Sequence, residues 1–169
     1  DMDLILSVND GARIRCDLNS DHSNYVDLIG GGDLHLKYNP IDDIRITGRY
    51  TLNNGEMKYS LPVIPLKTFT IQDGSYIEFQ GDPMNPKLDI TAKERTKATV
   101  SSQGETGRSV TFDCGVIITK TLKNMGLQFT IDAPEDMNIS NQLSAMSTEQ
   151  RGKLAVTMLT TGMYLADGN

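Results

Sequence analysis

Apolar and polar residues alternate along most of this chain with a period of two. The alternation is clearest over residues 69–92, FTIQDGSYIEFQGDPMNPKLDITA, where three short alternating runs are separated by two turn signals. A period of two places apolar side chains on one face of a β-strand and polar side chains on the other. The pattern therefore predicts an all-β fold in which successive strands share one apolar face.

Three glycine-containing turn signals interrupt the alternation and predict β-hairpins. Three-residue loops at residues 9–11 and 72–74, each ending on a left-handed glycine, would keep the flanking apolar residues on one face. In the second hairpin Phe69 would lie opposite Ile77, whereas a two-residue loop would break the apolar face. A two-residue turn at residues 54–55 fits the third hairpin best.

The apolar signal weakens after Ala92. Residues 93–107 are rich in Lys, Glu, Arg, Ser and Gly, and we expect them to be the most mobile stretch, with at most a weak edge strand. Strong alternation returns over residues 110–118 and 127–131, which predicts two further strands that are partners or neighbours.

The C-terminal segment, residues 136–169, has a different pattern. Ser147 followed three residues later by Gln150 matches a capping box, and apolar residues then recur at helical spacing. The sequence predicts one short helix, at about residues 148–161, which we expect to plug one end of the sheet formed by residues 1–135. Together the two parts form a single β-rich domain of 169 residues.

Composition excludes several classes of partner. Sixteen basic residues stand against 22 acidic ones, the net charge is −6, and aromatic residues make up only 6% of the chain. A nucleic-acid interface or a polybasic contact with anionic lipid needs a basic patch that is missing here. No apolar run reaches the length of about 18 residues that a membrane-spanning helix needs. The chain opens in full strand alternation, so we expect it to be a fragment of a larger protein.

The cysteines and histidines do not predict a metal site. Cys16 and Cys114 both fall on inward positions, where two buried thiols are the favoured interpretation. A disulfide stays open, because it requires Cα atoms within about 7 Å. His22 lies in a polar loop and His35 on a polar strand face, so these four residues are not expected to form a zinc site.

Carboxylates are the remaining candidates for catalysis. Asp42, Asp43, Glu94 and Asp113 should point outward and stay solvated, because strands alternate charge outward by default. The paired carboxylates of a β-helix carbohydrate enzyme are not expected. Nucleophile-elbow, P-loop and dinucleotide motifs are missing from the sequence. The sequence therefore predicts a protein that is not an enzyme and that needs no cofactor and no metal.

The apolar face has two uses that pattern alone does not separate. A second layer can cover it, as in a sandwich core. Alternatively it can stay partly open as a trough, which proteins avoid unless they bind something apolar. Eight methionines suit either use, because methionine serves both as core filler and as adaptable lining.

Several of these motifs carry a family resemblance. A strand ending in D-G-S, followed by I-x-F-x-G-D-P-x-N-P-x-L-D-I-x-A, runs through residues 73–92. The preceding Gly48-Arg49-Tyr50 and Asn54-Gly55, and the later residues 126–134, fit the same pattern. Over about residues 30–165 the chain resembles the C-terminal domain of TamB-type envelope proteins, which belong to the wider AsmA-like group.

The resemblance implies a bent, partly open β-sheet, described as a β-taco or open β-helix, with an apolar inside. It implies a periplasmic protein anchored in the inner membrane, in a segment outside this chain, that moves phospholipid between the two membranes. It also implies assistance to outer-membrane protein assembly and secretion, together with a TamA/BamA-type barrel protein. The alternative is a chaperone-like module that binds proteins through exposed strand edges by β-augmentation.

The same resemblance assigns the inward positions to the lining of a groove for acyl chains, with no catalytic residue. These positions are Leu4, Leu6, Ile14, Leu34, Leu36, Ile46, Tyr59, Phe69, Ile71, Ile77, Phe79, Leu88, Ile90, Phe112, Val116 and Phe129.

The resemblance also locates the barrel contact, which would lie nearest residues 128–169. The chain stops short of the strands that the family pattern places at its extreme C-terminus, so we expect the partner-binding end to be absent. We also expect the isolated sheet to form dimers through its edges or mouth to mouth.

Overall fold

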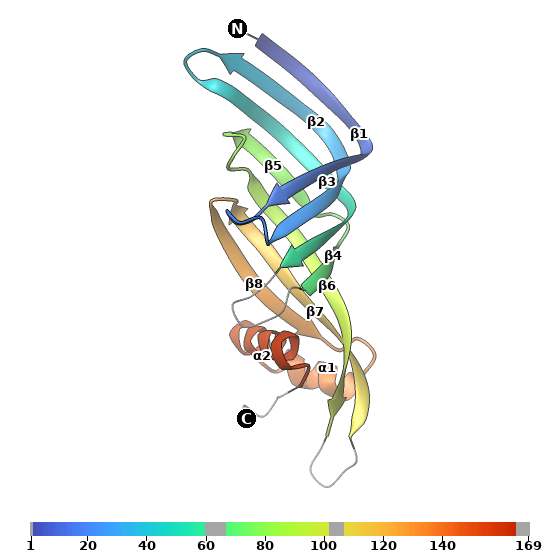
Figure 1. Cartoon of the computed structure of the whole chain (residues 1–169). Coiled ribbons are helices and arrows are strands. Elements are labelled where there is room, and N and C mark those ends of the chain that lie inside the picture. Colours follow the sequence, from blue (N-terminus) through green and yellow to red (C-terminus); the bar gives the residue numbers. More distant parts are fainter. Residues whose placement is uncertain (1, 60–66, 102–106, 165–169) are drawn as a thin grey trace.

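The computed structural model describes residues 2–59, 67–101 and 107–164. The side chains of Asp10, Cys16, Asn54 and Tyr59 also lie outside the described part. The described chain forms one bent antiparallel sheet with a helical region at its C-terminal end (Figure 1). The prediction of an all-β fold with a bent, partly open sheet and a C-terminal helix is confirmed.

Eight strands and two helices make up the described fold. The strands are β1 (Met2–Asp17), β2 (Tyr25–Asn39), β3 (Asp43–Tyr59), β4 (Lys67–Ile71), β5 (Tyr76–Gly81), β6 (Lys87–Val100), β7 (Arg108–Thr121) and β8 (Asn124–Asp132). The helices are α1 (Met137–Ser144) and α2 (Thr148–Thr161). The strand order is β1-β2-β3-β4-β6-β7-β8, and β5 shares with β4 the space between β3 and β6.

The predicted hairpin at residues 72–74 is wrong. β4 and β5 both pair antiparallel with β3, so they run in the same direction and form one interrupted strand. Phe69 lies opposite Met57, and Ile77 lies opposite Tyr50, rather than opposite each other. The signal at residues 72–74 makes a local turn within this strand instead of reversing the chain.

The other two predicted hairpins are also continuous strands. β1 runs through residues 9–11 with a register shift against β2, and β3 runs through Gly55 with one extra residue. Gly11 and Gly55 have φ values of +100° and +147°. A glycine with positive φ suits a β-bulge as well as a hairpin turn, so these signals bend the strands rather than end them.

These irregularities lie at one level across the sheet, which we call the crease: residues 9–11, 30–32, 52–55 and 72–75. Gly30 pairs with Ala12 on one side and with Leu52 on the other. A Cβ on Gly30 would lie 1.9 Å from the carbonyl oxygen of Thr51, so only glycine lets the strands approach this closely. Figure 1 shows a sharp bend in β1 at this level.

Inside the bend, one side chain spans two strands. The Tyr50 hydroxyl on β3 donates a hydrogen bond to the Ala12 carbonyl on the folded-back half of β1. Tyr50 is fully buried, and burial raises the pKa of its hydroxyl. A buried tyrosine needs such a partner for its hydroxyl, and this bond links β3 to the second half of β1 across β2.

The C-terminal helix was predicted correctly, and it covers part of the sheet. α2 spans Thr148–Thr161, with the predicted capping box between Ser147 and Gln150. It packs against β8 and β7 through four buried residues, Leu154, Ala155, Met158 and Leu159.

Helix α1 was not predicted. Its N-cap Asp136 accepts a hydrogen bond from the Ile139 backbone N–H at 3.0 Å, and Arg108 donates to the same carboxylate. Because only Ile139 and Leu143 are buried, eight residues carry too little apolar periodicity to be recognised.

The polar stretch after Ala92 is also more regular than predicted. β6 continues to Val100, and it pairs with β7 as far as Val100 opposite Arg108. The second half of β6 lacks apolar alternation because the polar residues Glu94 and Thr96 occupy inward positions. It is nevertheless a strand because it forms backbone hydrogen bonds with β7, whose alternation is strong. Residues 102–106 of the predicted mobile stretch lie outside the described residues.

The only free cysteine in the described part of the chain, Cys114, lies in the core. It is fully buried on β7, opposite Glu94. Burial, followed by the nearby carboxylates of Glu94 and Asp113, raises its pKa to about 12. Because the thiolate is the reactive form, this thiol should be inert while the protein is folded.

The glycine crease generates a stability prediction. Gly30→Ala should destabilise the fold by about 3 kcal/mol or more, because the added methyl meets fixed backbone. Gly11→Ala is the matched control, since its Cβ would enter open space and incur only the positive-φ cost of about 1–2 kcal/mol. Urea unfolding measures both, and equal losses for the two variants would contradict a steric crease.

Cys114 generates a second prediction. At pH 8 its alkylation by iodoacetamide should be about a thousandfold slower in the folded protein than in urea, because its thiolate fraction falls with the raised pKa. Peptide mass spectrometry distinguishes Cys114 from Cys16. Fast labelling of Cys114 under native conditions would mean that β7 is not covered in solution.

Candidate apolar ligand-binding groove

The sheet register brings the predicted groove positions to one face. Leu4 pairs with Leu36, Leu36 with Ile46, and Val116 with Phe129, so apolar side chains stand next to each other across strands. Every predicted groove position whose side chain the structure describes lies on this face. The side chain of Tyr59 lies outside the described part. We call this surface the inner face.

Burial divides the inner face into two parts. The buried members are Leu34, Phe69, Ile71, Ile77, Leu88, Ile90, Phe112 and Val116. The half-buried members are Ile14, Leu36, Ile46, Phe79 and Phe129. Leu4 and Leu6 are exposed, at 44% and 42% of their surface. The inner face is therefore a closed core toward the helices and an open surface toward the N-terminal end.

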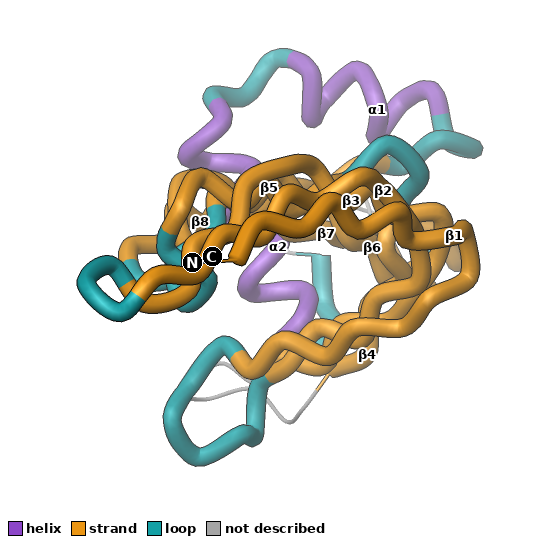
Figure 2. The backbone as a smooth tube through the Cα atoms, turned by 90° about the horizontal axis from the view of Figure 1, so that it is seen from above, coloured by secondary structure: helices purple, strands orange, loops and turns teal. Residues whose placement is uncertain are grey.

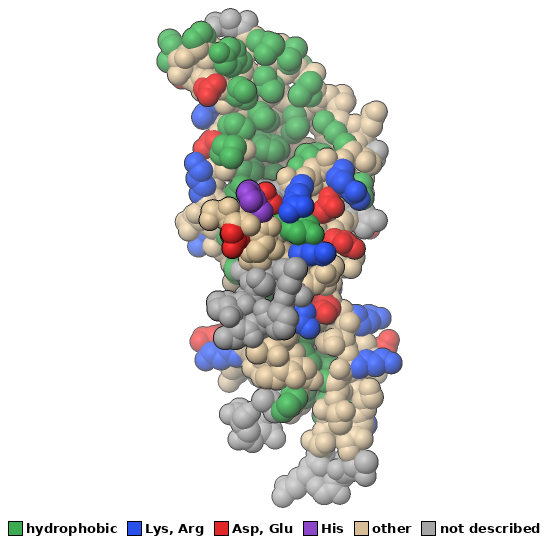
Figure 3. Space-filling model, viewed as in Figure 1, with side chains coloured by type: hydrophobic (Ala, Val, Ile, Leu, Met, Phe, Trp, Pro, Cys, Tyr) green, Lys and Arg blue, Asp and Glu red, His purple; other side chains and the backbone are tan. Residues whose placement is uncertain are grey.

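The open part is a contiguous apolar strip on the first three strands, which we call the open groove. Its members are Met2, Leu4, Leu6, Leu36, Tyr38, Ile44 and Ile46. Figure 3 shows this gathering of hydrophobic side chains at the end of the molecule where β1, β2 and β3 lie. Exposed apolar strips of this kind mark a surface that binds something. Both uses of the apolar face left open by the pattern thus occur, one on each side of the crease.

An apolar cavity of about 370 Å³ lies where the open groove meets the crease. Its floor is formed by Tyr50, Ile77 and Phe79, and Ile14 reaches it from the folded-back half of β1. The opposite wall comes from residues 82–86, the loop between β5 and β6, and from the β7–β8 turn. The wall residues are Pro83, Met84, Pro86 and Leu122.

The wall loop is the G-D-P-x-N-P motif. The Asp82 carboxylate accepts a hydrogen bond from the Met84 N–H at 2.9 Å, and the Asn85 side chain accepts one from the Lys123 N–H at 2.8 Å. These bonds fix the two prolines over the cavity. Sequence reasoning recognised the motif but missed that it lines a site, because its distance from β1 in the sequence hides their proximity.

Polar groups stand at the rim of the cavity. His22 Nδ1 lies 2.7 Å from the Asp17 carboxylate, and Arg15 donates to the same carboxylate at 3.3 Å. The hydrogen bond with His22 lowers the pKa of Asp17. Arg15 also lies over the Tyr25 ring, 3.9 Å from its centroid.

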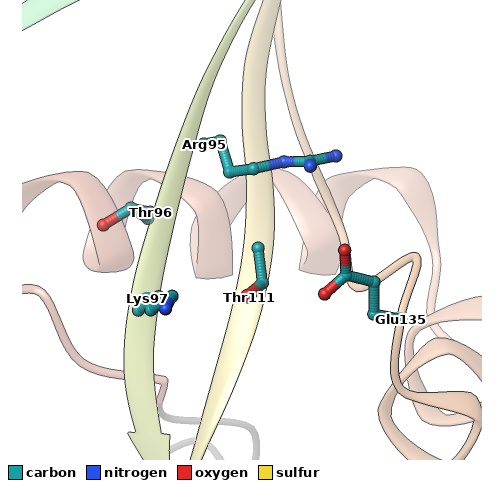
Figure 4. A pocket seen from close by; sticks show the side chains of 5 residues that line it. All are labelled: Arg95, Thr96, Lys97, Thr111 and Glu135. Carbon is teal, nitrogen blue, oxygen red and sulfur yellow. The ribbon is translucent and has the colours of Figure 1, made fainter.

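A second hollow is polar. Arg95, Thr96, Lys97, Thr111 and Glu135 line a shallow notch formed by β6, β7 and the chain before α1 (Figure 4). Arg95 forms an exposed ion pair with Asp113 at 2.9 Å. Exposed pairs of this kind contribute little energy, and the notch offers no buried group to a ligand.

The candidate carboxylates do not converge. Asp113 pairs with Arg95 on one face of the sheet, Glu94 lies on the other face opposite Cys114, and Asp42 accepts from Asn39 in the β2–β3 turn. The expectation that Glu94 points outward is wrong, because its pairing with Cys114 places it on the inner face. Its Oε2 atom is buried without a hydrogen-bond partner among the described residues.

Among the described residues, no group of three or more His, Cys, Asp or Glu side chains is placed to hold a metal ion. Neither described helix is long and apolar enough to cross a membrane.

Comparison with known proteins agrees with this geometry. The family model of the TamB C-terminal domain matches residues 1–168. No curated protein and no solved structure matches the chain. The family acts in the translocation and assembly module of the bacterial envelope, in partnership with TamA. The chain therefore belongs to the TamB C-terminal domain family.

Proposed function

We propose that this domain carries phospholipid acyl chains along the open groove, as part of a non-enzymatic periplasmic path between the inner and outer membranes. The observation that carries the proposal is the open groove itself, a contiguous apolar strip with Leu4 and Leu6 more than two-fifths exposed. Each acyl CH₂ that leaves water for such a surface gains about 0.8 kcal/mol. A chain of about ten carbons therefore offsets several kcal/mol of the cost of leaving a membrane.

The length of the open groove supports a lipid ligand. From Gly32 to Tyr38, β2 extends about 20 Å at about 3.3 Å per residue. One leaflet of a bilayer has a hydrocarbon thickness of about 15 Å. The open groove is therefore long enough for a complete acyl chain, and no bond need be made or broken to move it.

In the same proposal the domain works with a TamA/BamA-type barrel in outer-membrane protein assembly and secretion. A segment outside this chain anchors it in the inner membrane. The C-terminal end of the intact protein makes the barrel contact. Dimers of the isolated domain, through edges or mouth to mouth, would then result from removing its neighbours.

The alternative is a module that binds proteins by β-augmentation. The observation that favours it is the long edge strand β1, which pairs with β2 alone among the described strands. Such an edge offers backbone N–H and C=O groups to an incoming strand. The two functions predict different results from the same pair of variants.

The decisive pair is Leu6→Asp and Ile5→Asp. Both residues lie on β1, but Leu6 lies on the inner face and Ile5 on the opposite face, where it is 78% exposed. Leu6→Asp should reduce phospholipid that co-purifies with the protein at least about tenfold, because a carboxylate would have to be buried beneath an acyl chain. Ile5→Asp should leave it unchanged. Native mass spectrometry with lipid extraction measures both.

Equal lipid content in the two variants would overturn the groove proposal. So would a wild-type protein that carries no lipid. In either case, binding of an outer-membrane strand peptide by wild type and Leu6→Asp alike would support β-augmentation.

A further inference from the structure

The open groove has a blind end. Beyond the crease, the inner side chains of the two sides of the sheet pack into one buried core that includes Leu28, Met57 and Ile118. α2 then packs on β7 and β8 and buries the rest of the inner face. Figure 2, which looks down the molecule, shows α2 inside the curve of the sheet. An acyl chain that slides down the groove therefore cannot continue along the axis of this domain.

The apolar cavity lies at this blind end and opens to the side. One lip is the folded-back end of β1 with the loop that follows it, carrying Arg15, Asp17 and His22. The other lip is the loop of residues 82–86, where Met84 is 67% exposed. Phe79 lies in the cavity, and the strand that carries it pairs with Ile46 of the open groove at Gly81. Groove and cavity thus form one apolar surface with a lateral opening.

The rim matches the chemistry of a phospholipid head group. Arg15 offers a guanidinium, which binds phosphate oxygens in a bidentate manner, and His22 offers a second nitrogen beside it. Asp17 lies between them and offers a carboxylate to a head-group amine. Apolar walls with both charge signs at one lip suit an amphiphile with apolar chains and a phosphate-bearing head.

We propose that this cavity is a lateral port, at which a phospholipid enters or leaves the groove with its acyl chains against Phe79, Ile77 and Met84 and its phosphate at Arg15 and His22. The proposal rests on the proposed function, because it concerns the same lipid. It adds the place at which the conduit in this domain ends and the residues that contact the head group there. α2 and the packed core are then the stop that directs lipid sideways.

Photolabelling of the full-length protein tests the port. The probe is a phosphatidylethanolamine with a diazirine on its acyl chain, supplied in phosphatidylethanolamine vesicles, and adducts are mapped by peptide mass spectrometry. Adducts are expected on the open groove and on Ile77 and Phe79, and not on Phe129 of β8 or on Met158 of α2, which belongs to the stop. Met84→Asp should lower labelling of Ile77 and Phe79 at least tenfold.

Met163→Asp is the matched control, since Met163 is 51% exposed and is not part of the cavity lining. It should leave labelling unchanged. Arg15→Gln removes the charge and keeps a polar side chain that can still donate a hydrogen bond, and it should lower labelling of the cavity severalfold. Unchanged labelling in Arg15→Gln would overturn the head-group contact.

The outcomes separate the two proposals. Adducts in the open groove that continue to Phe129 or Met158, or that are insensitive to Met84→Asp, would overturn the port and leave lipid carriage standing. A complete lack of adducts on the open groove and the cavity would overturn lipid carriage, and the port with it.

Discussion

The close backbone approach at Gly30 and Gly32 is the constraint on which the rest of the structure depends. At these positions a Cβ would lie 1.9 and 2.0 Å from carbonyl oxygens of β3, so the two paired strands can approach this closely at the crease only where β2 has no side chain. At the bend, β1 and β3 each contain extra residues relative to β2, and these bulges let both strands stay paired with β2 on either side of it. Without this bend, a flat sheet would expose the part of its apolar face that α2 does not cover.

The crease also decides which apolar residues become core and which become groove. Leu6 and Phe112 occupy equivalent places in their alternating patterns, yet Leu6 is exposed and Phe112 is buried. The difference lies in what covers them, because β7 receives α2 and the first half of β1 receives nothing within the described chain. Amphipathic alternation reports the face of a strand, whereas coverage is a property of the tertiary fold.

The same difference between local pattern and tertiary coverage decided what was predictable from the sequence. The face assignment and α2 followed from local signals, namely the alternation and the capping box at Ser147. The predicted hairpins were wrong because a glycine with positive φ is compatible with a turn and with a β-bulge alike. The choice depends on β2, which is one continuous strand from Tyr25 to Asn39 and pairs with both halves of β1. The outward orientation predicted for Glu94 was wrong for a similar reason, because pairing with β7 sets its register. The cavity was not predicted, because its walls come together only in the bent sheet.

The bend therefore gives the open groove its length as well as its end. Because β1 bends at residues 9–11, Ile14 lines the cavity together with Tyr50, and the Tyr50 hydroxyl donates a hydrogen bond to that half of β1. The uncovered length of β2 above this point is about 20 Å, slightly more than one leaflet of hydrocarbon. A lipid lying in the groove therefore already reaches the cavity. If the domain carries lipid as proposed, travel within it is short, and the free energy of transfer has to be balanced by the exchange at its two ends rather than by sliding between them.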